Sequence, residues 1–257
     1  MKRAFLALGL GFLWAPVLLM AAYAFSESRV PFQWGGFSTR WFTALAANER
    51  LLEAAWLSLR IAAASASLAL LLGLALGWVL ARHGHFAGRP IFGALAGAPL
   101  VLPEVVTGLA LLLLFVGLQA LTGWPAQRGA MTVWLAHSAL GMAYVAVLVQ
   151  ARLASLDPAL EEVAADLGAS PLAVFGTVTL PLIVPSLAAG WLLAFTLSLD
   201  DVVLASFVSG PGATTLPVYL FSQLRLGMTP EANALAVVML GGAAVLGGIA
   251  WVIRRPG

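Results

Sequence analysis

Long apolar runs separated by short polar segments set the pattern of this 257-residue chain. A run of about 20 residues or more can cross the ~30 Å hydrocarbon core of a bilayer as a helix. Hydropathy, read with helix start and stop signals, predicts six spans, at 5–25, 54–81, 90–118, 131–151, 181–200 and 230–253. The last has the clearest start, with Thr229 as a cap, Pro230 at the first helical position and Glu231 in the first turn. We therefore expect an all-α polytopic membrane protein, with residues 1–257 in a single transmembrane domain.

The composition agrees with lipid as the main solvent. Apolar residues make up 61% of the chain and charged residues 9%, against roughly 25% charged in an ordinary soluble domain. The chain has no Cys, which excludes disulfides and Cys metal sites. A net charge of +2 is too small to indicate a nucleic-acid partner. The histidines and acidic residues do not have the spacing of metal ligands, so we expect no metal site. No hydroxyl, histidine and acid form a catalytic arrangement, so we expect no enzyme.

Basic residues next to the spans set the predicted orientation, because Lys and Arg are enriched in cytoplasmic loops. An even number of spans places both termini on one side, and the basic pairs at the two ends favour the cytoplasm. On this topology the cytoplasmic basic residues are Lys2, Arg3, Arg82, Arg89, Arg152, Arg254 and Arg255, whereas Arg29, Arg40, Arg50, Arg128 and Arg225 lie outside. The first run exceeds the roughly 7–15 residues of a secretory signal core. We therefore expect an uncleaved first span.

The predicted cytoplasmic loop at 152–180 is large enough to have structure of its own. Asp157 followed by Pro158 indicates a helix start, and Gly168 indicates its stop about ten residues later. One face of this helix has an apolar stripe, formed by Leu160, Val163, Ala164 and Leu167. The acidic residues face elsewhere: Glu161, Glu162 and Asp166.

A second short helix is predicted to follow in the same loop, because Ser170 and Pro171 repeat the cap-and-proline signal, and to end before Pro181. In the first helix Glu162 and Asp166 stand four apart, where like charges repel by a few tenths of a kcal/mol. The residues alone leave two interpretations open. The acidic face is either solvated at the membrane surface or a contact surface for a cationic partner.

The loop also contains a spaced motif: Glu162-Val163-Ala164, three further residues, Gly168, nine further residues, and Val178-Thr179-Leu180-Pro181. It resembles the EAA signature of the inner-membrane permease subunits of binding-protein-dependent ABC importers. Val163 stands where that family has Ala, and Val178 where it has Ile. Both departures keep the apolar character.

The resemblance implies the type I ABC importer permease fold, in which this coupling loop docks on a cytoplasmic ATPase subunit. It assigns Glu162, Ala164 and Gly168 to the coupling. Asp166 and Pro171 are added to this set from their places in the same two helices. The resemblance also implies a second permease subunit, an ATPase dimer and a periplasmic or secreted substrate-binding protein as partners.

The energy source is expected to lie outside this chain. A Walker A loop needs a lysine that reaches the phosphates, and Lys2 is the single lysine of the sequence. We therefore expect no cofactor here, with ATP bound by the partner ATPase.

Three acidic residues in or beside the spans are candidates for a transport pathway, because a carboxylate in the bilayer core needs a cavity or a partner. Glu104 lies fifteen residues beyond Arg89, about 22 Å along a continuous helix, and shallower if the PLVLP segment breaks that helix. Asp200 and Asp201 close the fifth span. Together these acids favour a cationic substrate. The alternatives are a helix end in the headgroup region for the aspartate pair and an internal hydrogen bond for Glu104.

Nearly the whole chain is similar to the spermidine/putrescine permease subunits, most clearly in PLVLPEVVTGLALLLLF and in SLDDVVLASFVSGPGATTLPVYLF. This resemblance implies a polyamine substrate, putrescine first and spermidine second, moved by alternating access. It implies that Glu104, Asp200 and Asp201 contact the substrate in transit. The alternative is an ion-coupled secondary transporter of a cationic substrate.

Small and polar residues inside the spans give weaker signals. Gly73/Gly77 and Gly93/Gly97 have the GxxxG spacing that permits close helix contact. His137 is expected to be hydrogen-bonded inside the helix bundle.

An internal echo is also present. PLVLPEVVTGL and PLIVPSLAAGW, 82 residues apart, share Pro, Leu, Pro and Gly at matching offsets. A parallel repeat and chance similarity are equally consistent with it.

Overall fold

The computed structural model describes residues 2–30, 33–226 and 230–253. Apart from an isolated β-bridge between Ser26 and Phe37, the regular structure of these residues is helical. Five of their helices are long and apolar enough to cross a membrane: Phe5–Tyr23, Glu49–Arg82, Glu104–Thr122, Ala130–Ala154 and Pro171–Asp200. The sixth predicted span coincides with α12 (Pro230–Ile253). Glu231 lies in the first turn of α12 as predicted, and the predicted cap Thr229 lies outside the described residues.

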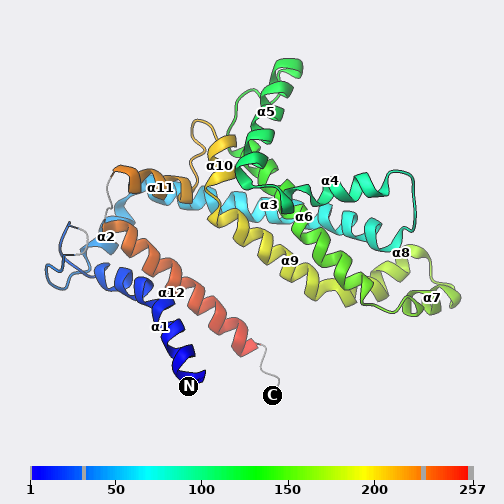
Figure 1. Cartoon of the computed structure of the whole chain (residues 1–257), viewed down its shortest axis with the longest axis horizontal. Coiled ribbons are helices and arrows are strands. Elements are labelled where there is room, and N and C mark those ends of the chain that lie inside the picture. Colours follow the sequence, from blue (N-terminus) through cyan, green and yellow to red (C-terminus); the bar gives the residue numbers. More distant parts are fainter. Residues whose placement is uncertain (1, 31–32, 227–229, 254–257) are drawn as a thin grey trace. The chain divides into compact units, whose positions relative to one another are not determined.

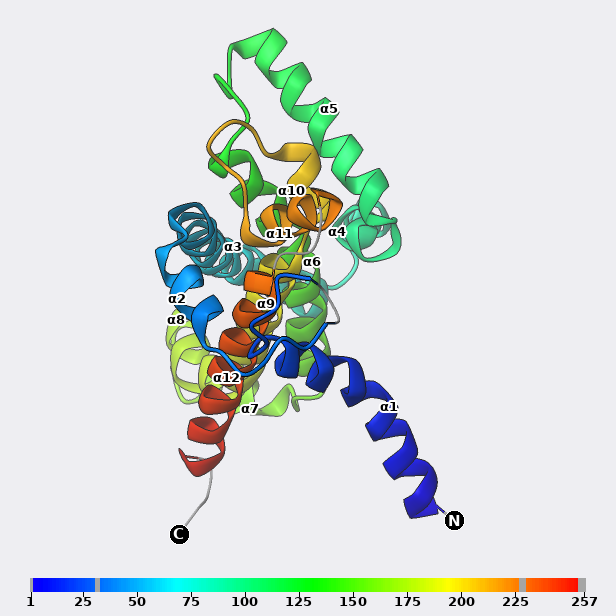
Figure 2. The same cartoon turned by 90° about the vertical axis from the view of Figure 1, so that its left-hand side faces the viewer.

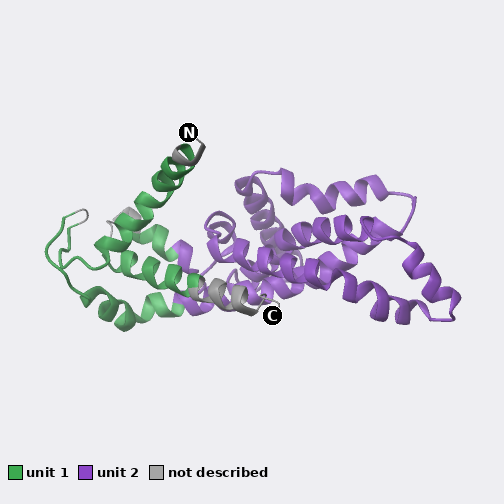
Figure 3. Ribbon diagram, turned by 90° about the horizontal axis from the view of Figure 1, so that it is seen from below, with its two compact units in different colours: residues 1–53, 219–257 green, residues 54–218 purple. Residues whose placement is uncertain are grey.

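The chain divides into two compact units, residues 1–53 with 219–257 and residues 54–218 (Figure 3). The first unit contains α1 (Lys2–Tyr23), α2 (Arg40–Ala47) and α12. In it the buried Trp41 donates from Nε1 to the carbonyl oxygen of Ser26 at 2.6 Å. Asn48 Nδ2 donates to Glu231 Oε2 at 3.2 Å, which links the end of α2 to the start of α12.

The second unit has two apolar clusters that share α3 (Glu49–Arg82) and α6 (Ala130–Ala154). The first cluster adds α9 (Leu180–Asp200), and α3, α6 and α9 lie together in Figure 1. The second adds α5 (Glu104–Thr122) and the short α10 (Val203–Val208). The second unit ends at Val218, within helix α11 (Leu216–Leu226). The second unit contains both the predicted coupling loop and the three pathway acids.

One of the two predicted glycine pairs brings helices into close contact. A Cβ atom on Gly73 would lie 2.6 Å from Val145 Cβ, and one on Gly77 would lie 2.7 Å from the carbonyl oxygen of Ala146. Helices α3 and α6 therefore approach at a distance that no larger residue permits. A Cβ atom on Gly97 would meet no atom of the described residues within 4 Å.

The third predicted span is wrong as a single helix. It consists of α4 (Arg89–Val101) and α5, which begins at Glu104. Leu102 between them has extended backbone angles, φ −75° and ψ 139°, because a residue before proline is disfavoured in the helical region and Pro103 has no N–H to donate. The two helices leave this break in different directions (Figure 1, Figure 2).

The break also shows that the two similar segments, 99–109 and 181–191, differ in structure. The segment 99–109 contains the break, whereas 181–191 lies inside α9 without interruption, although Pro185 is within it. The two segments therefore do not share a backbone conformation, and a structural repeat is not supported.

We call residues 152–180 the elbow. It comprises the end of α6, then α7 (Ala159–Asp166), α8 (Pro171–Val174) and a π-helical turn η1 (Phe175–Thr179). The second short helix was predicted to end before Pro181, and this is wrong, because residues 171–200 form one continuous helical path. The wider π-helical turn pairs the N–H of Leu180 with the carbonyl of Phe175. It relieves the clash that the Pro181 ring makes with the preceding turn of an α-helix.

Candidate functional site

Both ends of α7 are closed as the sequence predicts. Asp157 Oδ1 accepts a hydrogen bond from the Ala159 N–H at 3.0 Å. At the other end Gly168 has φ +88°, in the left-handed region that favours glycine. The N–H groups of Gly168 and Ala169 donate to the carbonyls of Ala165 and Ala164 at 2.9 and 3.1 Å, the Schellman pattern. Gly168 is therefore needed for the sharp turn out of α7.

The outer surface of α7 is both apolar and acidic, and the described residues leave it uncovered. Leu167 is 84% exposed and Val163 58% exposed, so the predicted apolar stripe has no partner within the described residues. Glu162 and Asp166 are exposed, and neither makes a hydrogen bond or an ion pair with the described part of the chain. Exposed apolar side chains next to unpaired carboxylates indicate a contact surface.

Glu161 differs from its neighbour Glu162. Its Oε1 accepts from Arg82 Nη2 at 3.1 Å and from Thr179 Oγ1 at 2.8 Å. The sequence grouped Glu161 with the outward-facing acids, and the structure corrects this. The sequence did not indicate this pairing, because Arg82, the last residue of α3, is 79 residues away from Glu161 along the chain.

Asp201 is buried at the junction of α9 and α10. Its carboxylate accepts from the backbone N–H groups of Leu204 and Ala205 at 3.1 and 2.6 Å, so it caps α10. His137 Nε2 lies 3.1 Å from Asp201 Oδ2, and His137 Nδ1 lies 2.6 Å from Ser198 Oγ. The expectation that His137 is hydrogen-bonded within the bundle is confirmed.

The other two pathway candidates, Glu104 and Asp200, have exposed side chains. Asp200 ends α9 with an exposed side chain, and the exposed Glu104 lies in the first turn of α5. Helix α5 packs on α10, where a Cβ atom on Gly108 would lie 2.7 Å from the Phe207 ring. Glu104 is one turn before Gly108 on the same helix. The break at Leu102–Pro103 thus places Glu104 at a helix end rather than in the middle of a long span.

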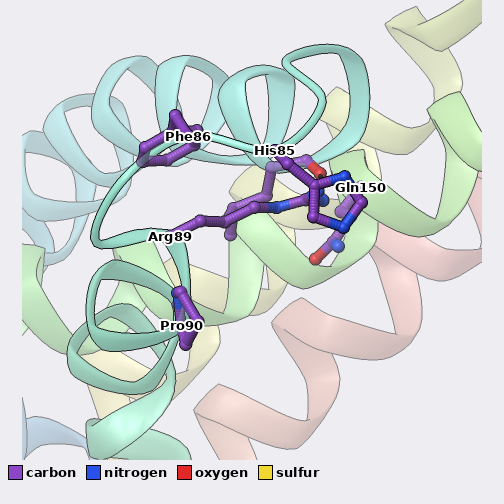
Figure 4. Close-up of a pocket in the computed structure, with 7 residues that line it drawn as sticks. His85, Phe86, Arg89, Pro90 and Gln150 are labelled. Carbon is purple, nitrogen blue, oxygen red and sulfur yellow. Dashed lines mark hydrogen bonds between the residues drawn. The ribbon is translucent and has the colours of Figure 1, made fainter.

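A cavity of about 610 Å³ lies beside the connector between α3 and α4 (Figure 4). His85, Phe86, Arg89 and Gln150 are among its lining residues, and none of the lining residues is acidic. Arg89 donates to the carbonyls of Gly84 and Leu80 at 3.0 and 2.7 Å, which fastens the connector. A cationic substrate would meet no carboxylate in this lining. Within the described residues, no group of three or more His, Cys, Asp or Glu could hold a metal ion.

In the part of the chain that the structure describes, helical architecture and several helices long and apolar enough to cross a membrane define a polytopic membrane protein. Residues 73–255 match the family described as the inner membrane component of binding-protein-dependent transport systems, and the chain belongs to this family. It is thus a multi-pass protein of the inner membrane. This confirms the prediction that the chain is a permease subunit and not an enzyme.

Two relatives from Escherichia coli are similar over most of their length. The putrescine transport system permease protein PotI is 52% identical over 248 residues, which are 96% of this chain and 88% of that protein. The spermidine/putrescine transport system permease protein PotC is 37% identical over 229 residues, 89% of this chain and 84% of that protein.

Two solved structures share the fold. A bacterial ABC transporter that imports the acidic polysaccharide alginate has a TM-score of 0.74 at 14% identity, covering 99% of this chain and 95% of that one. The MetNI methionine ABC transporter has a TM-score of 0.63 at 17% identity, covering 78% and 92%. The predicted ABC importer permease fold is confirmed.

Proposed function

We propose that this chain is a permease subunit of an ATP-driven importer that moves polyamines, putrescine first, across the inner membrane by alternating access. The observation that supports it most is the exposed α7 surface, in which Glu162 and Asp166 lie along one side of the exposed Val163 and Leu167. The chain that presents it is 52% identical to a putrescine permease over nearly its full length.

The α7 surface fits a cytoplasmic ATPase subunit. Uncovered Val163 and Leu167 would be removed from water on docking, and Glu162 and Asp166 would meet cationic side chains at its rim. The ATPase supplies the nucleotide site that a chain with one lysine lacks. A second permease subunit and a substrate-binding protein complete the assembly, and both termini of this chain lie in the cytoplasm.

The pathway acids suit a substrate with ammonium groups. Glu104 and Asp200 are exposed and offer free carboxylates that replace part of the hydration of an amine. The carboxylate oxygens of Asp201 already accept hydrogen bonds from three donors of this chain. We therefore assign Asp201 to stabilising the α9–α10 junction, next to Asp200. Putrescine has one ammonium group at each end, and Glu104 and Asp200 are the two exposed acids among the three candidates.

The test is uptake of labelled putrescine by proteoliposomes that contain the whole assembly. We expect Glu104→Gln and Asp200→Asn each to raise the KM for putrescine several-fold and to leave ATPase binding unchanged. Glu162→Gln is the comparison variant, because it neutralises an exposed acid outside the pathway. It should lower the uptake rate through weaker ATPase retention and leave the KM for putrescine unchanged.

Two results would refute the proposal. One is putrescine uptake with an unchanged KM in both pathway variants, which removes these acids from the pathway. The other is uptake driven by an ion gradient in the absence of ATP, which favours a secondary transporter.

A further inference from the structure

A link inside this chain fastens the elbow to two membrane-crossing helices. Glu161 on α7 accepts from Arg82 Nη2 at 3.1 Å and from Thr179 Oγ1 at 2.8 Å, both through the same oxygen, Oε1. Arg82 is the last residue of α3, and Thr179 is the last residue of the π-helical turn that leads into α9. One carboxylate oxygen therefore connects α7 to the cytoplasmic ends of α3 and α9.

The link is shielded from water. The side chains of Arg82 and Glu161 are 17% and 22% exposed, and Thr179 is fully buried. Arg82 Nε is also buried and has no hydrogen-bond partner among the described residues. Because Glu161 is the acid paired with Arg82, its removal leaves a poorly solvated guanidinium without compensation.

A second contact joins the same elements one turn further into the bundle. Trp78, four residues before Arg82 on α3, meets Phe175 of the π-helical turn edge to face, with ring centroids 5.0 Å apart and an interplanar angle of 81°. The end of α3 thus contacts both halves of the elbow. The aromatic pair holds the turn, and the Arg82–Glu161–Thr179 link holds α7.

We propose that Glu161 is a positioning residue for transport, with a role opposite to that of Glu162. Glu162 faces outward to the ATPase, whereas Glu161 faces inward and passes the displacement of α7 to α3 and α9 together. When the link is broken, α7 still docks on the ATPase but moves within the elbow, so ATP hydrolysis proceeds with less transport. This inference rests on the proposed function and assigns separate tasks to two adjacent glutamates.

The experiment measures ATP hydrolysis and putrescine uptake in the same proteoliposomes of the whole assembly. For Glu161→Gln we expect a several-fold fall in putrescine moved per ATP hydrolysed, with the ATPase retained on co-purification. The matched control Glu162→Gln should lower ATPase retention and both rates together, with the ratio of uptake to hydrolysis unchanged. The exchange of Arg82→Glu with Glu161→Arg should restore much of the ratio.

Thr179→Val is a second variant, which keeps the side-chain volume and the Arg82–Glu161 ion pair and removes one hydrogen bond. It should lower the ratio of uptake to hydrolysis less than Glu161→Gln does. An unchanged ratio in both Glu161→Gln and Thr179→Val would overturn the inference. If Glu161→Gln fails to assemble, an unchanged ratio in Thr179→Val and Arg82→Gln overturns it. Failure of the proposed function is distinguishable, because the unmodified assembly would then show no ATP-dependent putrescine uptake.

Discussion

Replacing Gly73 by alanine is expected to force α3 and α6 apart and to destabilise the bundle. The added Cβ atom would lie 2.6 Å from Val145 Cβ and 2.9 Å from the carbonyl oxygen of Met142. Neither neighbour has room to yield, because Val145 is fully buried and the carbonyl belongs to the backbone of α6. The clash therefore has to be met by a backbone shift.

Two terms of opposite sign set the magnitude. Overpacking of a well-packed core costs about 1–3 kcal/mol, whereas Gly to Ala inside a helix gains roughly 0.5–1 kcal/mol. The overpacking term is larger at Gly73, so the net effect is a loss of about 1–2 kcal/mol. For a chain of this size each kcal/mol corresponds to a fall of roughly 2–4 °C in Tm.

Gly97→Ala is the matched control. Gly97 belongs to the other GxxxG pair, and a Cβ atom there meets no described atom within 4 Å. Only the helix-propensity gain remains, so the Tm should stay the same or rise slightly. Thermal unfolding of both variants in one detergent gives the comparison. If Gly73→Ala and Gly97→Ala shift the Tm equally, the close approach of α3 and α6 is not what requires Gly73.

Further predictions concern the elbow and the α9–α10 junction. Asp201→Asn should lower stability by about 1–3 kcal/mol, because it disturbs buried hydrogen bonds, whereas Asp200→Asn should leave the Tm unchanged; equal Tm values would contradict the assigned roles. Gly168→Ala should strain the turn out of α7 by about 1–2 kcal/mol and weaken ATPase retention on co-purification, with full retention as the contrary result. Glu162→Lys should insert normally yet abolish ATPase association and transport, and normal uptake by vesicles containing this variant would count against the coupling surface.

Features with a local physical cause could be predicted from the sequence. The span at 230–253 coincides with α12, because a proline start and a continuous apolar run are both local signals. The ends of α7 were predicted for the same reason. Asp157 accepts from an N–H two residues away, and Gly168 alone supplies the left-handed turn.

The predictions that failed depend on how neighbouring segments compete. Leu102 and Pro103 interrupt the third span, although its hydropathy is continuous, because the proline restriction outweighs the apolar pattern there. Pro181 does not interrupt its helix, because the π-helical turn before it accommodates the proline ring and the helix continues into α9. Hydropathy does not distinguish these two outcomes.

Residue roles that depend on tertiary contacts could not be predicted from the sequence. Glu161 and Glu162 are identical and adjacent, and the positions of Arg82 and Thr179 give them different surroundings. Asp200 and Asp201 are likewise a pair in the sequence. Asp201 meets His137 from α6 and is buried, whereas Asp200 remains exposed.

The central claim is that ATP hydrolysis by a partner, received at the elbow, drives polyamine import through this subunit. The most direct test places the chain in proteoliposomes with its second permease, ATPase and binding protein, and compares putrescine accumulation with ATP, with a non-hydrolysable ATP analogue, and with this chain alone. We predict accumulation only in the complete assembly with hydrolysable ATP. Accumulation by the chain alone, or at an equal rate with the analogue, would contradict the account.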